Sequence, residues 1–288
     1  MLIDEKKHGK DPHYKKILKI EAINNRLEDL WVDFCPFADS NFKQDFPENL
    51  ISRFWEMYLG SMFIQEGKKL QKVSNGGPDI CIVEPAGNIL WVEAIASTPG
   101  VGPDKVPNLR KIDWIKKEKV ILRIRSAIEA KYIKYLSYLE KGYILDSDPY
   151  VIAINSFKIE HAQSDVYPSF IIQSISPIGP ETICINPETG EKTREGYKHR
   201  TEIIKINRAP VKTDIIMQDK YRVISAFIYS EVSPYEIPSK LGSKIRIVHN
   251  PKAINRIIDG WLPIGIEYKF DENNITRINW NRKTTESG

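Results

Sequence analysis

The segment that most constrains the fold is residues 76–96, which read GGPDICIVEPAGNILWVEAIA. Two runs rich in Ile, Val and Leu flank a Pro-Ala-Gly-Asn turn, and this pattern predicts a β-hairpin. Side chains alternate along a strand, so the second run places Glu93 on the same face as Trp91 and Ile95. A carboxylate inside an apolar strand is costly unless it is paired or binds a cation. Glu93 is therefore a candidate functional residue.

A second carboxylate, Asp79, stands at the start of the first strand of this hairpin. Two carboxylates brought together at the mouth of a sheet repel each other, and a divalent cation relieves that repulsion. Oxygen ligands of this kind suit Mg²⁺ or Mn²⁺. The alternative is structural: Asp79 caps the turn after Gly-Gly-Pro, and Glu93 pairs with a neighbouring Lys or Arg.

Two helical patterns bracket the hairpin. Residues 47–66 carry apolar side chains at i, i+4 and i+8 and end before Gly67, and residues 117–141 form a second helix that ends at Gly142. The buried strand PYVIAINS follows at residues 149–156. A helix that feeds a strand beside earlier strands predicts an α/β sheet.

After residue 160 the sequence is rich in short strands separated by turns such as PETG and DENN. We find no flexible linker between the two halves, so a single domain with a β extension is expected. The expected division is an N-terminal helical or irregular segment (residues 1–46), an α/β core (47–160) and a β-rich C-terminal extension packed on the core (161–288).

The order helix, hairpin, helix and strand over residues 48–156, with Pro78-Asp79 followed by Glu93, resembles the PD-(D/E)XK nuclease superfamily. The resemblance implies a restriction-endonuclease-like core, a mixed sheet flanked by helices, here with a β-rich C-terminal elaboration. It also implies a metal-dependent nuclease that hydrolyses phosphodiester bonds, with DNA as the expected substrate. The sequence departs from the family motif at its third position, where Ile95 replaces the usual lysine.

Some members of the superfamily supply that basic group from the helix after the acidic strand. On this helix Lys131 lies at one flank of the apolar face and Arg125 at the other, whereas Lys134 is expected to point elsewhere. Lys131 is the candidate, because the run RSAIEAK looks like the basic helix of such members. The alternative is that Lys131 only extends its stem over the core and keeps its ammonium group in water.

Glu56 is the remaining candidate side chain. It lies at the border of the apolar face of the first helix, in the setting Glu-Met-Tyr-Leu-Gly. Members of the fold often place an acidic, metal-supporting residue on this helix in a similar setting. The alternative is an ordinary solvated glutamate.

The resemblance assigns a role to each candidate. Asp79, Glu93 and the carbonyl of Ala94 would bind one or two Mg²⁺ ions, or Mn²⁺, and Glu56 would support the metal directly or through water. Lys131 would orient the attacking water or stabilise developing charge. Two other functions stay open: a catalytically inactive, nuclease-like nucleic-acid-binding protein, and an unrelated α/β protein in which the two acidic groups serve only structure.

Composition adds weaker constraints. The net charge of +4 is compatible with a nucleic-acid partner but does not argue for one, although basic residues are dense between Lys111 and Arg125. Three scattered cysteines indicate buried free thiols in a reducing compartment, and no apolar run reaches the length of a membrane span. We therefore expect a cytoplasmic protein without a membrane partner. Whether it is a homodimer stays open, since nucleases that cut both strands are often dimers. The five histidines have no local metal-ligand spacing, which argues against zinc.

Overall fold

A computed structural model of the chain describes residues 1–3, 9–73, 76–109, 114, 116–164, 166–271 and 274–283. Its centre is an eight-stranded sheet in the order β1-β2-β3-β4-β9-β10-β11-β12. The strands of this sheet are β1 (Lys69–Gln71), β2 (Ile80–Val83), β3 (Ile89–Ala96), β4 (Tyr150–Asn155), β9 (Ile224–Ser230), β10 (Arg246–His249), β11 (Ile266–Asp271) and β12 (Asn274–Asn279).

The sheet is mixed. Strands β1, β2 and β3 are antiparallel neighbours, as the hairpin prediction requires, and β3, β4 and β9 run parallel. Beyond them β9 and β10 are antiparallel, β10 and β11 parallel, and β11 and β12 antiparallel. The parallel connection from β3 to β4 passes through a helix, which is the usual way to join parallel strands. The expected α/β class, with a large mixed sheet flanked by helices, is confirmed.

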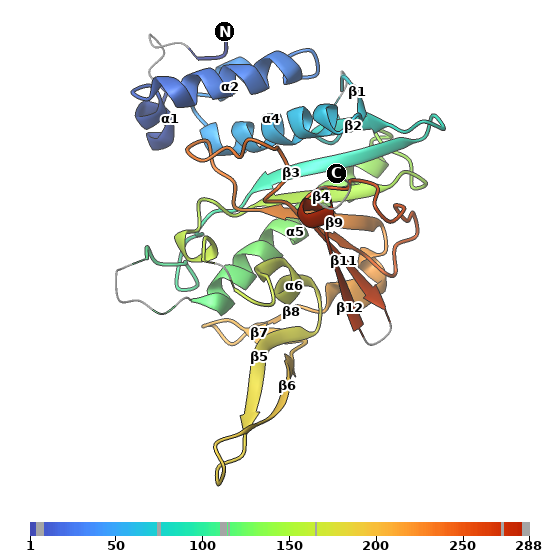
Figure 1. Ribbon diagram of the computed structural model, residues 1–288. Coiled ribbons are helices and arrows are strands. Elements are labelled where there is room, and N and C mark those ends of the chain that lie inside the picture. The colour runs from blue at the N-terminus through green and yellow to red at the C-terminus, as the bar shows by residue number, and fades with distance from the viewer. Residues whose placement is uncertain are drawn as a thin grey trace.

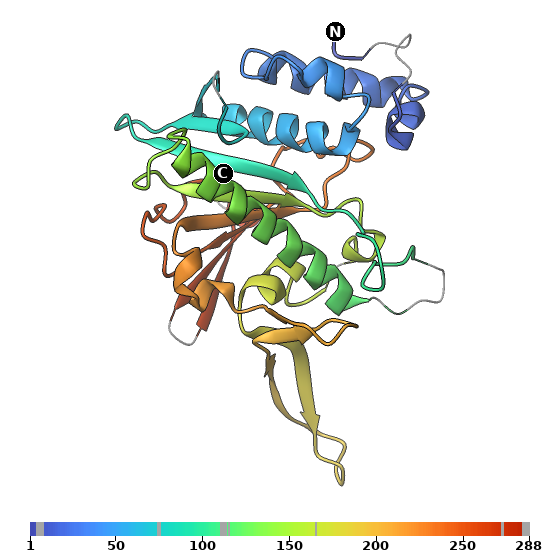
Figure 2. The same cartoon turned by 180° about the vertical axis from the view of Figure 1, so that it is seen from behind.

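Helices cover both faces of the sheet (Figure 1 and, from behind, Figure 2). One layer holds α1 (Pro12–Ile17), α2 (Glu21–Phe34), α3 (Phe42–Asp45) and α4 (Leu50–Gln65). The other layer holds α5 (Lys117–Glu140) and α6 (Phe170–Ile175), and the short α7 (Trp280–Lys283) follows β12. The two long helices predicted from apolar periodicity are thus present, with ends within a few residues of those expected.

Helix α4 is buried on its outer side as well as against the sheet, because α2 packs over it. The hydroxyl of Ser61 donates to the carbonyl of Leu30 at 2.8 Å. A Cβ atom added at Gly60 would lie 2.2 Å from the ring of Phe34, so only glycine allows α2 to approach this closely. Helix α4 is therefore enclosed between α2 and the sheet, which is why its sequence is apolar on most of its surface.

Strand β3 alternates as predicted between the two layers. Leu90 and Val92 belong to the hydrophobic core on the α4 side. Trp91 and Ile95 pack against the core on the α5 side. Glu93 therefore faces α5, and this placement decides which cations it meets.

A two-stranded arm, β5 (Ile178–Ile185) and β6 (Lys192–His199), projects away from the body of the molecule (Figure 1). Its turn contains the predicted PETG sequence. A smaller hairpin, β7 (Glu202–Ile204) and β8 (Pro210–Lys212), follows it. The segment after residue 160 is β-rich as expected, and its strands β9–β12 belong to the central sheet.

The central sheet crosses the boundary expected at residue 160, because β9 pairs directly with β4. Strands β9–β12 therefore extend the core sheet itself. The expectation that all three cysteines are buried also needs correction: Cys81 is buried, but Cys35 and Cys184 are exposed. None of the helices in the described part of the chain is long and apolar enough to cross a membrane.

Candidate functional site

Asp79 lies where β2 stops pairing with β3. It immediately precedes Ile80, whose partner on β3 is Val92. The Oδ2 atom of Asp79 accepts a hydrogen bond from the backbone N–H of Ala94 at 2.7 Å. In an extended strand the N–H and C=O of one residue point to the same side, so the carbonyl of Ala94 also faces the end of β2. The carboxylate of Asp79 and the carbonyl of Ala94 therefore lie close together at the start of β2.

Glu93 is fully buried, with a side-chain exposure of 0%. Its Oε1 atom accepts hydrogen bonds from Lys131 Nζ at 2.5 Å and Lys134 Nζ at 2.7 Å. Its Oε2 atom accepts from the hydroxyl of Tyr138 at 3.1 Å. These three donors come from successive turns of α5, since residues three or four apart share one side of a helix. The buried charge is therefore paired and hydrogen-bonded, as a buried charge must be.

Lys131 also joins the two acidic groups, because its Nζ lies 3.9 Å from Asp79 Oδ2. Its side chain is 12% exposed, so its ammonium group does not simply extend into water. The structure thus brings Asp79, Glu93 and Lys131 together. Arg125, on the opposite flank of α5, does not join them: it donates to the carbonyl of Lys212 at 2.7 Å and to the hydroxyl of Tyr221 at 3.0 Å.

The expectation that Lys134 points elsewhere is wrong. Helical position alone put this residue outside the sheet-facing arc, but its long flexible stem reaches back over Tyr138 to Glu93, with its ammonium 5.4 Å from the ring centre. Burial alone would lower the pKa of Lys134, but the charges of Glu93 and Asp79 raise it above its usual range. Lys134 is a site residue that sequence reasoning missed, and a basic side chain one turn after Lys131 was the available signal.

The pKa of the Asp79 carboxyl group is shifted by the other charged groups of the site. Burial, followed by the negative charge of Glu93, raises the pKa of Asp79 to about 6, and the two lysines only partly oppose this rise. A side-chain exposure of 23% nevertheless leaves Asp79 accessible from solvent. Of the two acidic groups, Asp79 is the one that an incoming cation can reach first.

Glu56 lies on α4, in the layer opposite Lys131. It is buried, so the solvated alternative does not describe it. Its Oε2 atom accepts from Arg53 Nη1 at 2.9 Å, and Arg53 also contacts Asp39 at 2.8 Å and Asp45 at 2.6 Å. Burial and then the charge of Asp79 raise the pKa of Glu56 to about 8, against the opposing effect of Arg53. Glu56 is therefore coupled to the site through charge.

A cavity of about 320 Å³ connects Glu56 with Asp79. Its lining residues come from the α2–α3 connection, α4 and the segment before β2: Phe37, Asp39, Ser40, Glu56, Lys72, Val73, Gly76, Gly77, Pro78 and Asp79. The cavity is polar on the side of the carboxylates, and it is large enough for several water molecules. A small polar ligand or a hydrated cation can therefore reach Asp79 from the α4 side.

The three acidic candidates do not form one tight ligand set. Within the described part of the chain, one group of three His, Cys, Asp or Glu side chains has all its ligand atoms within 4.8 Å of one another, and that group does not contain Glu56, Asp79 or Glu93. The sheet separates Glu56 on the α4 side from Glu93 on the α5 side, with Asp79 at the edge between them. An ion shared by the three acidic groups would therefore have Asp79 as its common ligand, because Asp79 lies between the other two.

Two basic residues near the start of α5, Lys119 and Arg123, hold a neighbouring segment. Arg123 Nε donates to the carbonyl of Thr98 at 2.9 Å, and Lys119 Nζ donates to the carbonyls of Pro103 at 3.0 Å and Lys105 at 3.2 Å. These contacts fix the Gly- and Pro-rich loop after β3 against α5. Lys111 lies outside the described residues.

No protein-family model, curated protein or solved structure matches this chain.

Proposed function

We propose that this protein is a metal-dependent nuclease with a restriction-endonuclease-like core, and that it hydrolyses phosphodiester bonds of DNA. The observation that carries the proposal is the meeting of Asp79, Glu93 and Lys131 at the point where β2 and β3 separate. An acid before one hairpin strand, an acid within the next and a lysine beside both are the parts that the sequence resemblance requires. The lysine comes from α5, which compensates for Ile95 at the usual lysine position.

The donor set at this point fits Mg²⁺ or Mn²⁺. Asp79 and Glu93 offer carboxylate oxygens and Ala94 offers a carbonyl oxygen, which are the ligand types that these ions prefer. Glu56 opens on the same cavity as Asp79 and would support the ion through water. A bound divalent ion would lower the pKa of a water ligand and neutralise charge on the transferring phosphate.

The two lysines that contact Glu93 would have different roles in the reaction. Lys131 lies between the two carboxylates, so its ammonium is positioned to turn toward an attacking water or a phosphate oxygen. Lys134 stays hydrogen-bonded to Glu93 and keeps that buried charge neutralised when Lys131 moves. Because cleavage of both strands of a duplex needs two such sites, we propose that the acting form is a homodimer.

A second function is a catalytically inactive protein that binds nucleic acid. One observation favours it: Glu93 is fully buried and already neutralised by two ammonium groups and a tyrosine hydroxyl. A carboxylate satisfied in this way does not need a metal ion. The two functions therefore differ in whether Lys131 leaves Glu93 in the presence of a divalent ion.

Plasmid cleavage in Mg²⁺ and in Mn²⁺ tests the proposal. We expect nicking or linearisation by the wild-type chain, and no cleavage in EDTA or by Asp79→Asn. Glu140→Gln, an exposed acid at the end of α5, is the matched control and should cleave normally. Binding of DNA without any cleavage would support the inactive relative instead. Neither cleavage nor DNA affinity, with circular dichroism showing a folded chain, would contradict both functions.

A further inference from the structure

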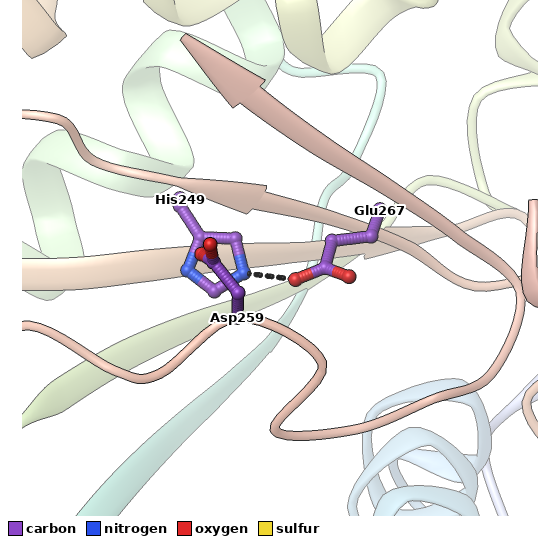
Figure 3. Close-up of side chains that lie close together, drawn as sticks. All are labelled: His249, Asp259 and Glu267. Carbon is purple, nitrogen blue, oxygen red and sulfur yellow. Dashed lines mark hydrogen bonds and ion pairs between the residues drawn. The ribbon is translucent and has the colours of Figure 1, made fainter. Parts of the chain in front are cut away.

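A second group of polar side chains lies at the other end of the sheet, away from Asp79. His249 ends β10, Glu267 lies on the adjacent parallel strand β11, and Asp259 lies in the loop that joins these strands. Figure 3 shows the three side chains pointing toward one another. His249 Nε2 and Glu267 Oε1 are 2.7 Å apart, and one ligand atom from each of the three residues lies within 4.8 Å of the others.

Glu267 is held in a fixed position. It is buried, and its Oε1 atom accepts from the backbone N–H of Gly260 at 2.9 Å in addition to its contact with His249. Its Oε2 atom accepts from Trp280 Nε1 at 2.8 Å. These partners orient the carboxylate toward the imidazole, in the way that outer-shell hydrogen bonds orient ligands in metal sites. These hydrogen bonds therefore fix the carboxylate of Glu267 before any ion binds.

The opposite side of the group is open. His249 and Asp259 line a cavity of about 290 Å³, together with Asn250, Lys269 and Thr276 among others. The side chain of Asp259 is 69% exposed, and its Oδ2 atom contacts Lys269 Nζ at 2.8 Å. An ion entering from solvent can thus reach His249 and Asp259 through the cavity, and Glu267 lies directly behind the imidazole, 2.7 Å from its Nε2 atom. The cavity has room for water ligands to complete the coordination.

We propose that His249, Asp259 and Glu267 bind a divalent transition-metal ion, with Zn²⁺ as the ion that fits best. An imidazole nitrogen with two carboxylate oxygens is a mixed donor set that suits Zn²⁺, whereas Mg²⁺ prefers oxygen alone. Ligands about 2.0–2.2 Å from a tetrahedral zinc ion lie roughly 3.3–3.6 Å from one another. His249 Nε2 and Glu267 Oε1, now 2.7 Å apart, therefore need to separate by less than about 1 Å. The ion replaces the hydrogen bond between these two residues, and Asp259 closes on it from the loop.

The sequence did not reveal this site, because the ligands come from three separate segments and have no local spacing. A bound ion would fasten the loop between β10 and β11 to both strands. The site lies on different strands from Asp79 and Glu93, so the inference is independent of the proposed nuclease activity.

The experiment uses the full chain after treatment with EDTA and removal of the chelator. Titration with ZnCl₂ should show one tight equivalent by calorimetry and a rise in melting temperature, since a ligand that binds only the folded state stabilises it. CoCl₂ should give a visible absorption band of the ligand-bound ion. His249→Gln keeps a side-chain donor for Glu267 but removes the imidazole, and it should abolish the band and weaken Zn²⁺ binding at least about tenfold. Asp259→Asn should weaken binding as well.

His199→Gln, a change at an exposed histidine on the arm, is the matched control and should leave Zn²⁺ binding unchanged. Asp79→Asn should also bind Zn²⁺ normally, which separates this site from the proposed nuclease site. The proposal is overturned if Co²⁺ gives no visible band, or if His249→Gln binds Zn²⁺ as tightly as the wild-type chain. Either result would mean that His249 and Glu267 form only a hydrogen-bonded pair.

Discussion

Lys134 donates to the same oxygen atom of Glu93 that Lys131 contacts, at 2.7 Å and 2.5 Å respectively. Two ammonium groups on one buried carboxylate leave a local excess of positive charge, and Asp79, 3.9 Å from Lys131, offsets it. Removing Lys131 from Glu93 therefore leaves the buried acid with a partner. In the proposed nuclease, this redundancy would allow Lys131 to act on a substrate while Lys134 keeps the buried charge of Glu93 paired.

If the protein is the proposed nuclease, substitution of Lys131 should slow cleavage more than substitution of Lys134. Lys131→Met is expected to lower the single-turnover cleavage rate by roughly 10²–10³-fold, the size of effect seen when one charge-stabilising donor is removed. Lys134→Met should lower the rate by less than about tenfold, because Lys131 then remains to stabilise the transition state. Cleavage of a labelled duplex under excess enzyme measures both. A larger loss in Lys134→Met than in Lys131→Met would reverse the assignment.

Much of the core followed from local sequence patterns. Alternation placed Glu93 on the face of Trp91, and helical periodicity put Lys131 near the sheet. These features depend on spacings within one or two elements, which the sequence records directly. The helix-to-helix contact at Gly60 and the pairing of β9 with β4 depend on segments far apart in the chain, and no local pattern encodes them.

The parts of the sites that were missed have the same origin. Lys134 reaches Glu93 through stem conformation, which helical angle does not determine. His249, Asp259 and Glu267 meet because β10 and β11 are parallel neighbours, and the loop between them folds back over both. These contacts can be identified only from the tertiary structure, because the residues share no sequence motif.

Glu93 should be important for stability as well as for activity. Glu93→Ala removes the buried carboxylate that Lys131 and Lys134 both contact. Because Lys131 keeps Asp79 at 3.9 Å and Lys134 is 45% exposed, we expect a loss of about 1–3 kcal/mol. Urea denaturation monitored by circular dichroism measures this change in the free energy of unfolding. The double variant Glu93→Gln with Lys131→Met, which removes one charge of each sign, should be more stable than Glu93→Ala. Equal stability of the two would show that the ion pairs contribute little.

Glu56 gives the protein a pH-dependent stability. Its pKa in the folded chain is about 8, raised by burial and by Asp79, and its ordinary value is 4.5. The folded state therefore holds this proton more tightly than the unfolded state. The resulting stability is fully present below about pH 4.5 and is lost as the pH rises through about 8.

Glu56→Gln should remove this dependence, because an amide does not titrate and its oxygen still accepts from Arg53. In EDTA, melting temperatures measured from pH 5 to pH 9 should fall for the wild-type chain and fall less for the variant, which becomes the more stable protein at alkaline pH. The remaining slope below about pH 6 belongs to Asp79, whose pKa is also raised. Parallel curves for the two proteins would contradict this account.

Arg125 and Arg123 stand two positions apart on α5 but should differ in their effects. Arg125 is buried and hydrogen-bonded to Lys212 and Tyr221, so Arg125→Ala should lower the free energy of unfolding by about 2–4 kcal/mol. Arg123 is half-exposed, with one hydrogen bond to the carbonyl of Thr98, and Arg123→Ala should cost about 1 kcal/mol. Urea denaturation of both variants tests the difference. Similar losses would indicate that the loop after β3 contributes more to stability than its contacts suggest.

The β5–β6 arm should be dispensable for the stability of the body. From Glu181 to Ile185 its first strand is exposed, including Ile183 and Ile185, and β5 and β6 form a separate two-stranded sheet. Because Glu181 pairs with Tyr197, an Asn-Gly turn can replace residues 182–196 and close the hairpin in register. We expect the melting temperature of this variant to stay within about 2 °C of the wild-type value, since few buried contacts are lost.

Ile203→Ala, a change at a buried residue of β7 near the base of the arm, is the contrasting control and should cost about 2–5 kcal/mol. A large drop in melting temperature on removing the arm, accompanied by a change in molecular mass in solution, would show instead that the arm stabilises the protein by contacting a second copy of the chain.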